Sequence, residues 1–160
     1  MSGLDDKPKS IYLAGPMRGI PHFNFPRFHA VTSLLRKDGH TVFNPAEKDI
    51  ERLGNDLSAG NPTGDEKQAA NEGFSLRQAL AEDCEFICKQ ADTVMMLPGW
   101  EKSNGAQAEQ RLAVALQSEG VEIVYLSEPL CVIMEQAAKH FAQQQVEFAE
   151  RAKAGENALA

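Results

Sequence analysis

Two acidic residues lie where a helix normally places buried apolar side chains. Wound at about 100° per residue, segment 103–116 puts Glu109 inside one arc of apolar residues, and segment 76–90 puts Asp83 inside another. A buried carboxylate costs several kcal/mol unless it is paired, hydrogen-bonded or neutralised. The surrounding apolar residues are Ala108, Leu112, Ala113, Ala115 and Leu116 for Glu109, and Leu76, Leu80 and Ile87 for Asp83.

Two inward acids are suited to glycosyl transfer. In that chemistry one carboxylate attacks or shields an oxocarbenium-like centre, while a second acid or hydrogen-bond donor orients it or assists the leaving group. We therefore interpret Glu109 and Asp83 as a catalytic pair, with the hydroxyl of Tyr12 as a donor to Glu109. The alternatives are structural: each acid could satisfy a buried donor or an arginine, the helix dipole favours an acid near a helix start, and Tyr12 could be a core aromatic residue.

Two loops carry candidate ligand-binding residues. The guanidinium of Arg18 has paired N–H donors that match a phosphate or a carboxylate, although it could equally pair with a surface acid. The helix start in "WEKSNGA" offers free N–H groups to a phosphate, although small polar residues often serve only as caps. Aromatic residues near these loops, Trp100, Phe23 and Phe25, could stack on a ligand or simply pack. The candidate substrate-binding residues are Gly15, Pro16, Met17, Arg18, Gly19, Trp100, Ser103, Asn104 and Gly105.

Short apolar runs alternate with helical segments and must position these residues. The runs "SIYLAGP", "TVFNP", "DTVMMLPGW" and "VEIVYL" predict buried strands, separated by helices over 24–40, 75–91 and 103–116 and followed by a long helix over 133–152. This order predicts a single-domain α/β fold: a Rossmann-like, doubly wound parallel sheet of four to five strands with helices on both faces. Ligands bind such sheets at the carboxyl ends of the strands, which directs attention to the loops after Leu13, Phe43 and Leu97.

The domain boundaries follow from the same survey. We expect a flexible N-terminus at residues 1–10, one domain over 11–152, and a flexible tail at 153–160. Within the domain, residues 54–73 are polar and glycine-rich without periodicity, which indicates a mobile surface loop or lid.

Composition argues against several classes of partner. The 160-residue chain has a net charge of −7 and no run of Lys or Arg, which disfavours nucleic-acid binding. No apolar run reaches the roughly 20 residues of a membrane helix, and the N-terminus has no signal-peptide pattern. The three cysteines are interpreted as reduced, which favours a cytoplasmic protein, and Cys84-x3-Cys88 without a nearby His gives no reason to expect a metal.

From Ile11 to Leu126 the chain resembles the nucleoside 2-deoxyribosyltransferase superfamily. It is most similar to a nucleotide (dNMP) N-glycosidase-like, phage and bacterial branch that opens with a "YLAGPMRG" strand. The resemblance rests on "IYLAGPMRG", the acid in "LAEDCEFI", the strand "ADTVMMLPGW" and "SNGAQAE" in this order and spacing. The superfamily usually has a second small residue near the glutamate, where this chain has "AQA", and the 54–73 segment and the C-terminal helix have no counterpart.

The resemblance implies roles for the candidate residues. Glu109 would be the nucleophile on the anomeric carbon, Asp83 would assist the base or orient Glu109, and Tyr12 would hydrogen-bond Glu109. Ser103 stands where free-nucleoside transferases carry an aspartate for the 5′-hydroxyl. With Arg18 after the first strand, this serine implies a 5′-monophosphate substrate, because a hydroxyl can donate to phosphate whereas an aspartate would repel it. No cofactor is implied.

The predicted function is cleavage or exchange of the N-glycosidic bond of a nucleotide, with hydrolysis narrowly preferred over transfer to a second base. A non-catalytic nucleotide-binding or sensing module is the alternative, and a structural protein is a third possibility that leaves both inward acids unexplained. We also expect a homodimer or higher homo-oligomer. Its interface would be a seam on the C-terminal helix formed by Ile133, Ala137, His140, Phe141 and Phe148.

Overall fold

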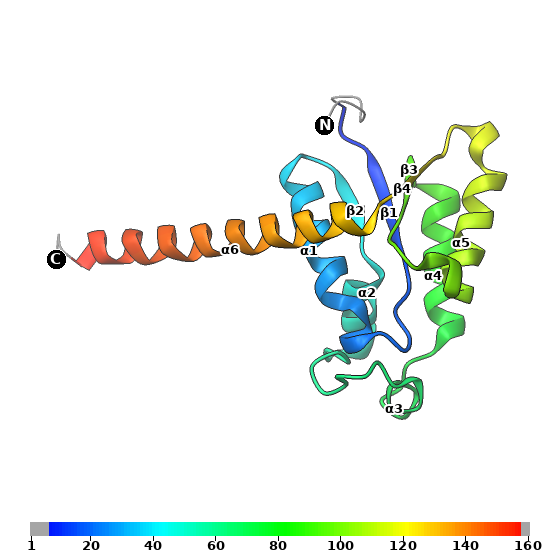
Figure 1. The fold of residues 1–160 in the computed structure, drawn as a ribbon, viewed down its shortest axis with the longest axis horizontal. Helices are drawn as coiled ribbons and strands as arrows, with labels where there is room; N and C mark the ends of the chain where they lie inside the picture. Colours follow the sequence, from blue (N-terminus) through cyan, green and yellow to red (C-terminus); the bar gives the residue numbers. More distant parts are fainter. Residues whose placement is uncertain (1–6, 158–160) are drawn as a thin grey trace.

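A computed structural model describes residues 7–157 and shows an α/β fold built on one parallel sheet (Figure 1). Four strands lie in the order β2-β1-β3-β4, so the predicted fold class is confirmed. The chain moves from β1 to one side for β2 and then to the other side for β3, so the strand order reverses between β1 and β3. The strands are β1 (Ser10–Ala14), β2 (Thr41–Phe43), β3 (Thr93–Met96) and β4 (Glu122–Tyr125).

Helices cover both faces of the sheet. In Figure 1, α1 and α6 lie on one side of the strands, and α4 and α5 lie on the other. The short α2 and α3 were not expected from the sequence. The helices are η1 (Pro21–Asn24), α1 (Phe25–Lys37), α2 (Pro45–Leu53), α3 (Glu66–Asn71), α4 (Leu76–Lys89), η2 (Trp100–Lys102), α5 (Asn104–Ala115), η3 (Gln117–Glu119) and α6 (Glu128–Asn157).

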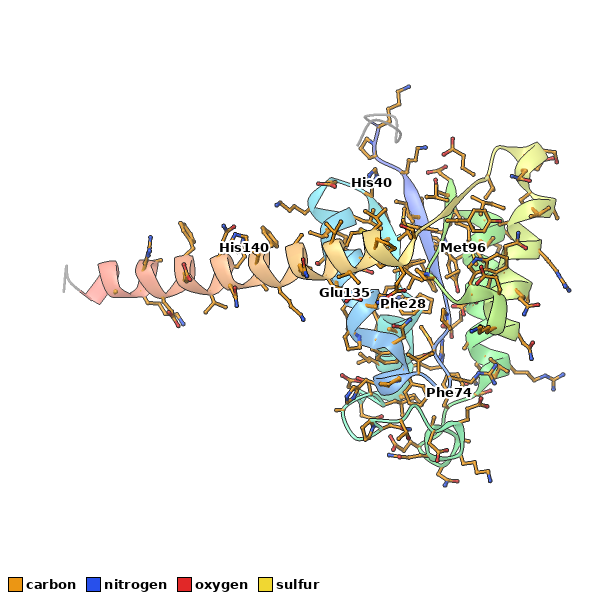
Figure 2. The ribbon with its side chains drawn as sticks, viewed as in Figure 1. Phe28, His40, Phe74, Met96, Glu135 and His140 are labelled. Carbon is orange, nitrogen blue, oxygen red and sulfur yellow. The ribbon has the colours of Figure 1, made fainter. Side chains whose placement is uncertain are left out.

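Each face of the sheet has its own apolar core because side chains alternate along a strand. Leu13 of β1 belongs to the core under α1 and α6, whereas Tyr12 belongs to the core under α4 and α5. Figure 2 labels one residue of each core, Phe28 and Met96. Tyr12 therefore faces the two helices that carry Asp83 and Glu109.

The segment 54–73 is more ordered than its sequence suggested. It contains α3 and buries Leu57, Asn61 and Ala69. The Asn61 side chain donates to the carbonyl of Asp65 at 2.9 Å and accepts from its N–H at 2.7 Å, and the Gly19 N–H donates to the carbonyl of Gly64 at 2.9 Å. Local hydrogen bonds of this kind leave no periodic pattern in a sequence. They hold the segment against the loop that follows β1.

The C-terminal helix differs from the expectation at both ends. It begins at Glu128 rather than at residue 133, because Pro129 suits the first turn of a helix. It continues to Asn157, so residues 153–157 are helical where a flexible tail was expected. Residues 1–6 and 158–160 of the expected flexible ends lie outside the described residues, and Ser10 already belongs to β1. The C-terminal part of α6 projects away from the sheet (Figure 1).

Two further observations concern the chain as a whole. Among the described residues, no helix combines the length and the apolar character needed to cross a membrane. The three cysteines, Cys84, Cys88 and Cys131, are free thiols.

Candidate active site

Asp83 of α4 and Glu109 of α5 line one cavity, as their helical positions predicted. This acid cavity has a volume of about 70 Å³ and lies beside Gly15, which follows β1, where open α/β sheets bind their ligands. Both acids are only 6% exposed. Neither forms an ion pair with any residue in the range 7–157. The structural explanation of two acids neutralised by buried cations therefore does not apply.

Burial and mutual repulsion raise the pKa values of both acids. Burial raises the pKa of Asp83 to about 7, with a smaller contribution from the charge of Asp49. Burial also raises the pKa of Glu109 to about 8, and the charge of Asp83 adds to this shift. Interacting acids lose their protons in steps that belong to the pair. Near neutral pH the pair therefore shares about one proton, which is the arrangement needed for one acid and one nucleophile.

Tyr12 supplies a hydroxyl at the buried end of this pair. Its ring packs on Phe43 and Phe86, with centroid separations of 5.4 and 6.3 Å. Its Oη is buried and makes no hydrogen bond to any described residue. The pKa of Tyr12 is raised well above its usual value, first by burial and then by the charges of Glu109 and Asp83, so the phenol lies near both acids. A buried donor without a partner costs about 1–3 kcal/mol, and packing alone does not account for it.

The α5 start presents a hydroxyl toward the same cavity. Ser103 is the N-cap, and its Oγ accepts a hydrogen bond from the Ala106 N–H at 3.3 Å. This bond leaves the Ser103 hydroxyl proton free to donate elsewhere. Ser103 and Gly105 line the acid cavity, together with Gly15 and Met17 of the loop after β1. A Cβ on Gly15 would lie 2.8 Å from the Cβ of Leu97, so only glycine allows this close approach.

Arg18 forms an ion pair with a surface acid, which was the alternative role considered for it in the sequence analysis. Its Nη1 lies 3.2 Å from Oε2 of Glu66, a partner from α3. The pair is solvent-accessible, with 31% of the Arg18 side chain and 59% of the Glu66 side chain exposed, so it contributes little stability. Arg18 nevertheless borders the acid cavity and the two cavities that adjoin it.

The adjoining cavities differ in character. The apolar cavity, of about 190 Å³, shares Met17, Arg18, Asp49, Phe74 and Leu76 with the acid cavity. The polar cavity, of about 640 Å³, shares Arg18 and Ser103 with it. The acid cavity thus adjoins both a polar and an apolar cavity, and these two also share Arg18 and Glu66 with each other. The polar cavity is further lined by Pro16, Ile20, Asn24, Arg27, Glu66, Pro98, Gly99, Lys102, Asn104 and Glu128.

The structure does not bring every predicted residue to these cavities. Trp100 stacks on Tyr125, with centroids 5.6 Å apart, and lines a separate depression, so the structure does not bring it to the acid cavity. Trp100 is the first residue of η2, which follows Gly99 at a left-handed φ of 85°. Gly19 lines none of the cavities and instead donates its N–H to the Gly64 carbonyl. The aromatic residues that do border the apolar cavity are Phe23, Phe25 and Phe74.

Asp49 is a site residue that sequence reasoning missed. It lies on α2, is 5% exposed, and lines both the acid and the apolar cavities. Its Oδ1 accepts a hydrogen bond from Nη1 of Arg52 at 2.7 Å. The sequence contained a signal for it: Asp49 lies three positions after Ala46 and four before Leu53, so it interrupts an apolar stripe as the other two acids do. No group of three or more His, Cys, Asp or Glu within residues 7–157 is arranged to hold a metal ion.

Comparison with known proteins places the chain in a family. The model of a family described as a domain of unknown function (DUF4406) matches residues 9–125. The chain belongs to this family. The DUF4406 region extends from just before β1 to the end of β4, and it contains every residue that lines the acid cavity. The helix α6 lies beyond the DUF4406 region. No curated protein and no solved structure matches the chain.

Proposed function

We propose that this protein cleaves the N-glycosidic bond of a nucleoside 5′-monophosphate, without a cofactor. The observation that carries the proposal is the pair of buried carboxylates, without an ion-pair partner among the described residues, in a cavity that adjoins both a polar and an apolar cavity. A nucleotide has three parts that match these cavities in chemical character: a charged phosphate, a sugar and an apolar heterocyclic base. The sugar would occupy the acid cavity.

The polar cavity supplies donors for the phosphate. Arg18 and Lys102 are cationic, and Ser103 offers its hydroxyl at the first turn of α5. The free N–H groups and the dipole at this helix start favour an anion. An aspartate in place of Ser103 would repel the phosphate, whereas the hydroxyl donates to it. These groups support a 5′-monophosphate over a free nucleoside.

The proton shared by the two acids defines the chemical steps. The higher pKa of Glu109 makes the form with the proton on Asp83 the less populated one, and the reaction proceeds from this form. In it, ionised Glu109 attacks the anomeric carbon and forms a C–O bond while the C–N bond breaks. The electron pair of the broken bond leaves with the base nitrogen, which takes the proton of Asp83. Water then attacks the anomeric carbon, Asp83 takes a proton from this water, and the C–O bond to Glu109 breaks. The products are the free base and the sugar 5-phosphate, and Glu109 is again a carboxylate.

A second base in place of water would give a new nucleotide, and we prefer hydrolysis narrowly. The test is to incubate the wild type and Glu109→Gln with deoxyribo- and ribonucleoside monophosphates, with and without free bases, and to follow base release by chromatography. We expect release by the wild type and a loss of about 10³-fold or more in the variant. Glu119→Gln, an exposed substitution outside the cavities, is the matched control. Tight nucleotide binding without any product would favour a sensing module instead.

The phosphate assignment has its own test. Arg18→Ala and Ser103→Asp should reduce kcat/KM on monophosphates by about tenfold or more, with a much smaller effect on the corresponding nucleosides. Equal losses on both substrate classes would reject the assignment of the polar cavity to phosphate.

A homo-oligomer is the second part of the proposal. Buried Cys131, Met134 and Ala138 form the face of α6 that packs on the body of the protein. Most of the expected seam lies on other faces and is exposed, up to 73% at Phe148 (Figure 2 labels its neighbour in the seam, His140). Phe141 differs, because its ring lies 4.5 Å from Nζ of Lys37. We expect Phe148→Asp to lower the sedimentation coefficient, and an unchanged value would reject this seam.

A further inference from the structure

The apolar cavity has one buried charged group. Three charged residues line it, but Arg18 and Glu66 form the solvent-accessible ion pair described above. Asp49, in contrast, is 5% exposed. The rest of the lining consists of Met17, Phe23, Phe25, Leu57, Ala69, Ala70, Phe74 and Leu76. A carboxylate in such surroundings is costly unless its oxygens have partners.

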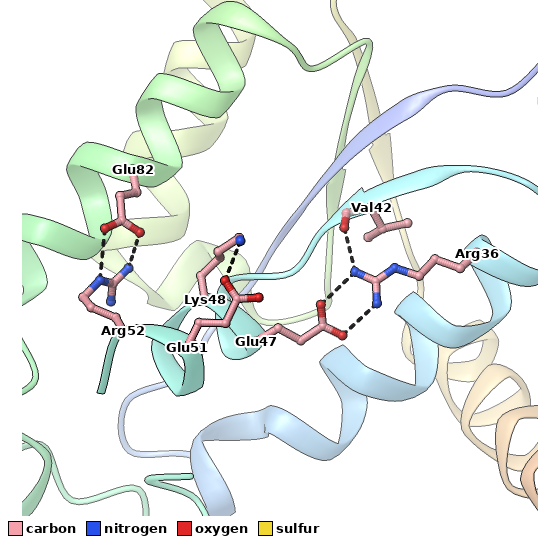
Figure 3. Close-up of polar contacts among 7 residues, drawn as sticks. All are labelled: Arg36, Val42, Glu47, Lys48, Glu51, Arg52 and Glu82. Carbon is pink, nitrogen blue, oxygen red and sulfur yellow. Dashed lines mark hydrogen bonds and ion pairs between the residues drawn. The ribbon is translucent and has the colours of Figure 1, made fainter. Parts of the chain in front are cut away.

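The packing of α2 holds this carboxylate in one orientation. Asp49 Oδ1 accepts a hydrogen bond from Arg52 Nη1. The same guanidinium donates from Nε and Nη2 to the two carboxylate oxygens of Glu82 on α4, at 3.2 and 2.7 Å, and Figure 3 shows this second pair. The helix is further tied to α1 by the two-point pair of Arg36 with Glu47. No residue in the range 7–157 donates to Oδ2 of Asp49. One oxygen is therefore anchored and the other is available to a ligand.

We propose that the apolar cavity binds the base of the nucleotide and that Asp49 accepts a hydrogen bond from an N–H group on the edge of that base. This inference rests on the proposed function, because it assumes that the sugar lies in the acid cavity, which Asp49 also lines. An ionised carboxylate only accepts hydrogen bonds, so it matches an amino group or a ring N–H. A base that lacks such a donor leaves the buried carboxylate without a partner, which a site of this kind penalises strongly.

The size of the cavity suits a planar heterocycle. Its volume of about 190 Å³ exceeds the roughly 150 Å³ that accommodates benzene in an engineered protein core. Phe23, Phe25 and Phe74 provide the aromatic surface on which such a ring can pack. Ala69 and Ala70 of α3 complete the wall, so the 54–73 segment takes part in recognition of the base.

The substitution Asp49→Asn should reverse this hydrogen-bond preference. Because Arg52 donates to Oδ1, the amide oxygen will take that position and the amide nitrogen will take the position of Oδ2. The variant then offers a donor where the wild type offers an acceptor. The experiment compares kcat/KM for AMP with that for purine riboside 5′-monophosphate, which has ring-nitrogen acceptors but no amino group. CMP and the 2-pyrimidinone analogue form the matched pyrimidine pair.

The decisive quantity is the ratio of kcat/KM within each pair. Differences in leaving-group reactivity cancel when this ratio is compared between the wild type and the variant. For whichever pair the cavity accepts, kcat/KM for the nucleotide with the amino group is divided by kcat/KM for the nucleotide without it. We expect this ratio to fall by about tenfold or more in Asp49→Asn. Glu51→Gln makes the same chemical change at an exposed position of α2, where Glu51 pairs with Lys48, and should leave the ratio unchanged. An equal ratio in the wild type and Asp49→Asn would overturn the assignment.

A binding measurement keeps the test independent of turnover and of the variant. Calorimetric titration of the wild type with free adenine and with unsubstituted purine should show tighter binding of adenine, by about tenfold. Cytosine against 2-pyrimidinone is the equivalent comparison. Equal affinities within both pairs would overturn the role of Asp49 even if Asp49→Asn fails to fold. Selective binding of the amino base without release of base from any nucleotide would reject the proposed catalysis and retain the base assignment.

Discussion

The burial of Glu109 predicts how the stability of the protein depends on pH. Its pKa is raised from 4.5 to about 8 in the folded state, so the folded protein binds a proton there more tightly than the unfolded chain does. Stability from this group is therefore fully present below about pH 4.5 and is lost as the pH rises to about 8. Glu109→Gln replaces the acid by a neutral side chain of the same shape and should remove this loss.

The magnitude follows from the displacement of the pKa. A pKa of about 8 in place of 4.5 corresponds to roughly 5 kcal/mol, at about 1.4 kcal/mol per pH unit. Water that enters the cavity screens the charge and reduces this figure. We expect Glu109→Gln to raise the free energy of unfolding by ~3 kcal/mol at alkaline pH, with little change at acid pH.

Urea unfolding at about pH 5 and about pH 9 measures this difference, provided that the protein concentration is constant. The far-ultraviolet circular dichroism of the helices reports the transition. Glu85→Gln is a suitable control because Glu85 is exposed and pairs only with Lys89 on α4. If the wild type and Glu109→Gln lose stability equally between the two pH values, then Glu109 is not a buried acid with a raised pKa, and our account of the pair is refuted.

Three further predictions concern single residues. Tyr12→Phe removes a buried hydroxyl that has no partner among the described residues, so it should raise the free energy of unfolding by about 1–3 kcal/mol while slowing base release by about tenfold or more. A loss of stability without a loss of turnover would assign Tyr12 to the core. Asp83→Asn removes the charge that raises the pKa of Glu109, so the rising limb of the pH–rate profile should move to lower pH, and an unmoved limb would contradict the coupling of the two acids. Gly64→Ala places a Cβ 2.2 Å from the Ile20 carbonyl oxygen at a φ of +70°, and thermal unfolding should show a loss of about 1–3 kcal/mol. Gly60→Ala, whose Cβ meets only the end of the Gln68 side chain at 3.9 Å, should be nearly neutral, and equal effects of the two substitutions would contradict the close approach at Gly64.

The sheet and the acid pair could be predicted because their signals are local and periodic. Continuous apolar runs identified all four strands. The central strands β1 and β3 are buried as expected for a parallel sheet, whereas β4 at the edge is half-buried to exposed, which corrects the expectation of a buried strand there. The α4 and α5 helices are long enough for a period of 3.6 residues to show that Asp83 and Glu109 point inward. These two features together predicted the end of the sheet at which the cavity lies.

The remaining features depend on geometry that the sequence does not display. α2 has nine residues, and its many charged side chains hide the short stripe that contains Asp49. Trp100 stacks on Tyr125, a residue of β4 that no local pattern pairs with it. The order of the 54–73 segment comes from hydrogen bonds between residues such as Asn61 and Asp65, which are also common in irregular loops.

The ion pair between Arg18 and Glu66 affects how a ligand would bind in the polar and apolar cavities. A phosphate that approaches the guanidinium exchanges one anionic neighbour for another, so the two anions compete for the same fork. A phosphate dianion competes with the Glu66 carboxylate more effectively than a neutral hydroxyl does. The displaced Glu66 is attached to α3, which also walls the apolar cavity. If the proposed phosphate site is correct, the carboxylate that competes with the substrate for Arg18 belongs to the same short helix that walls the apolar cavity, so the two cavities share α3.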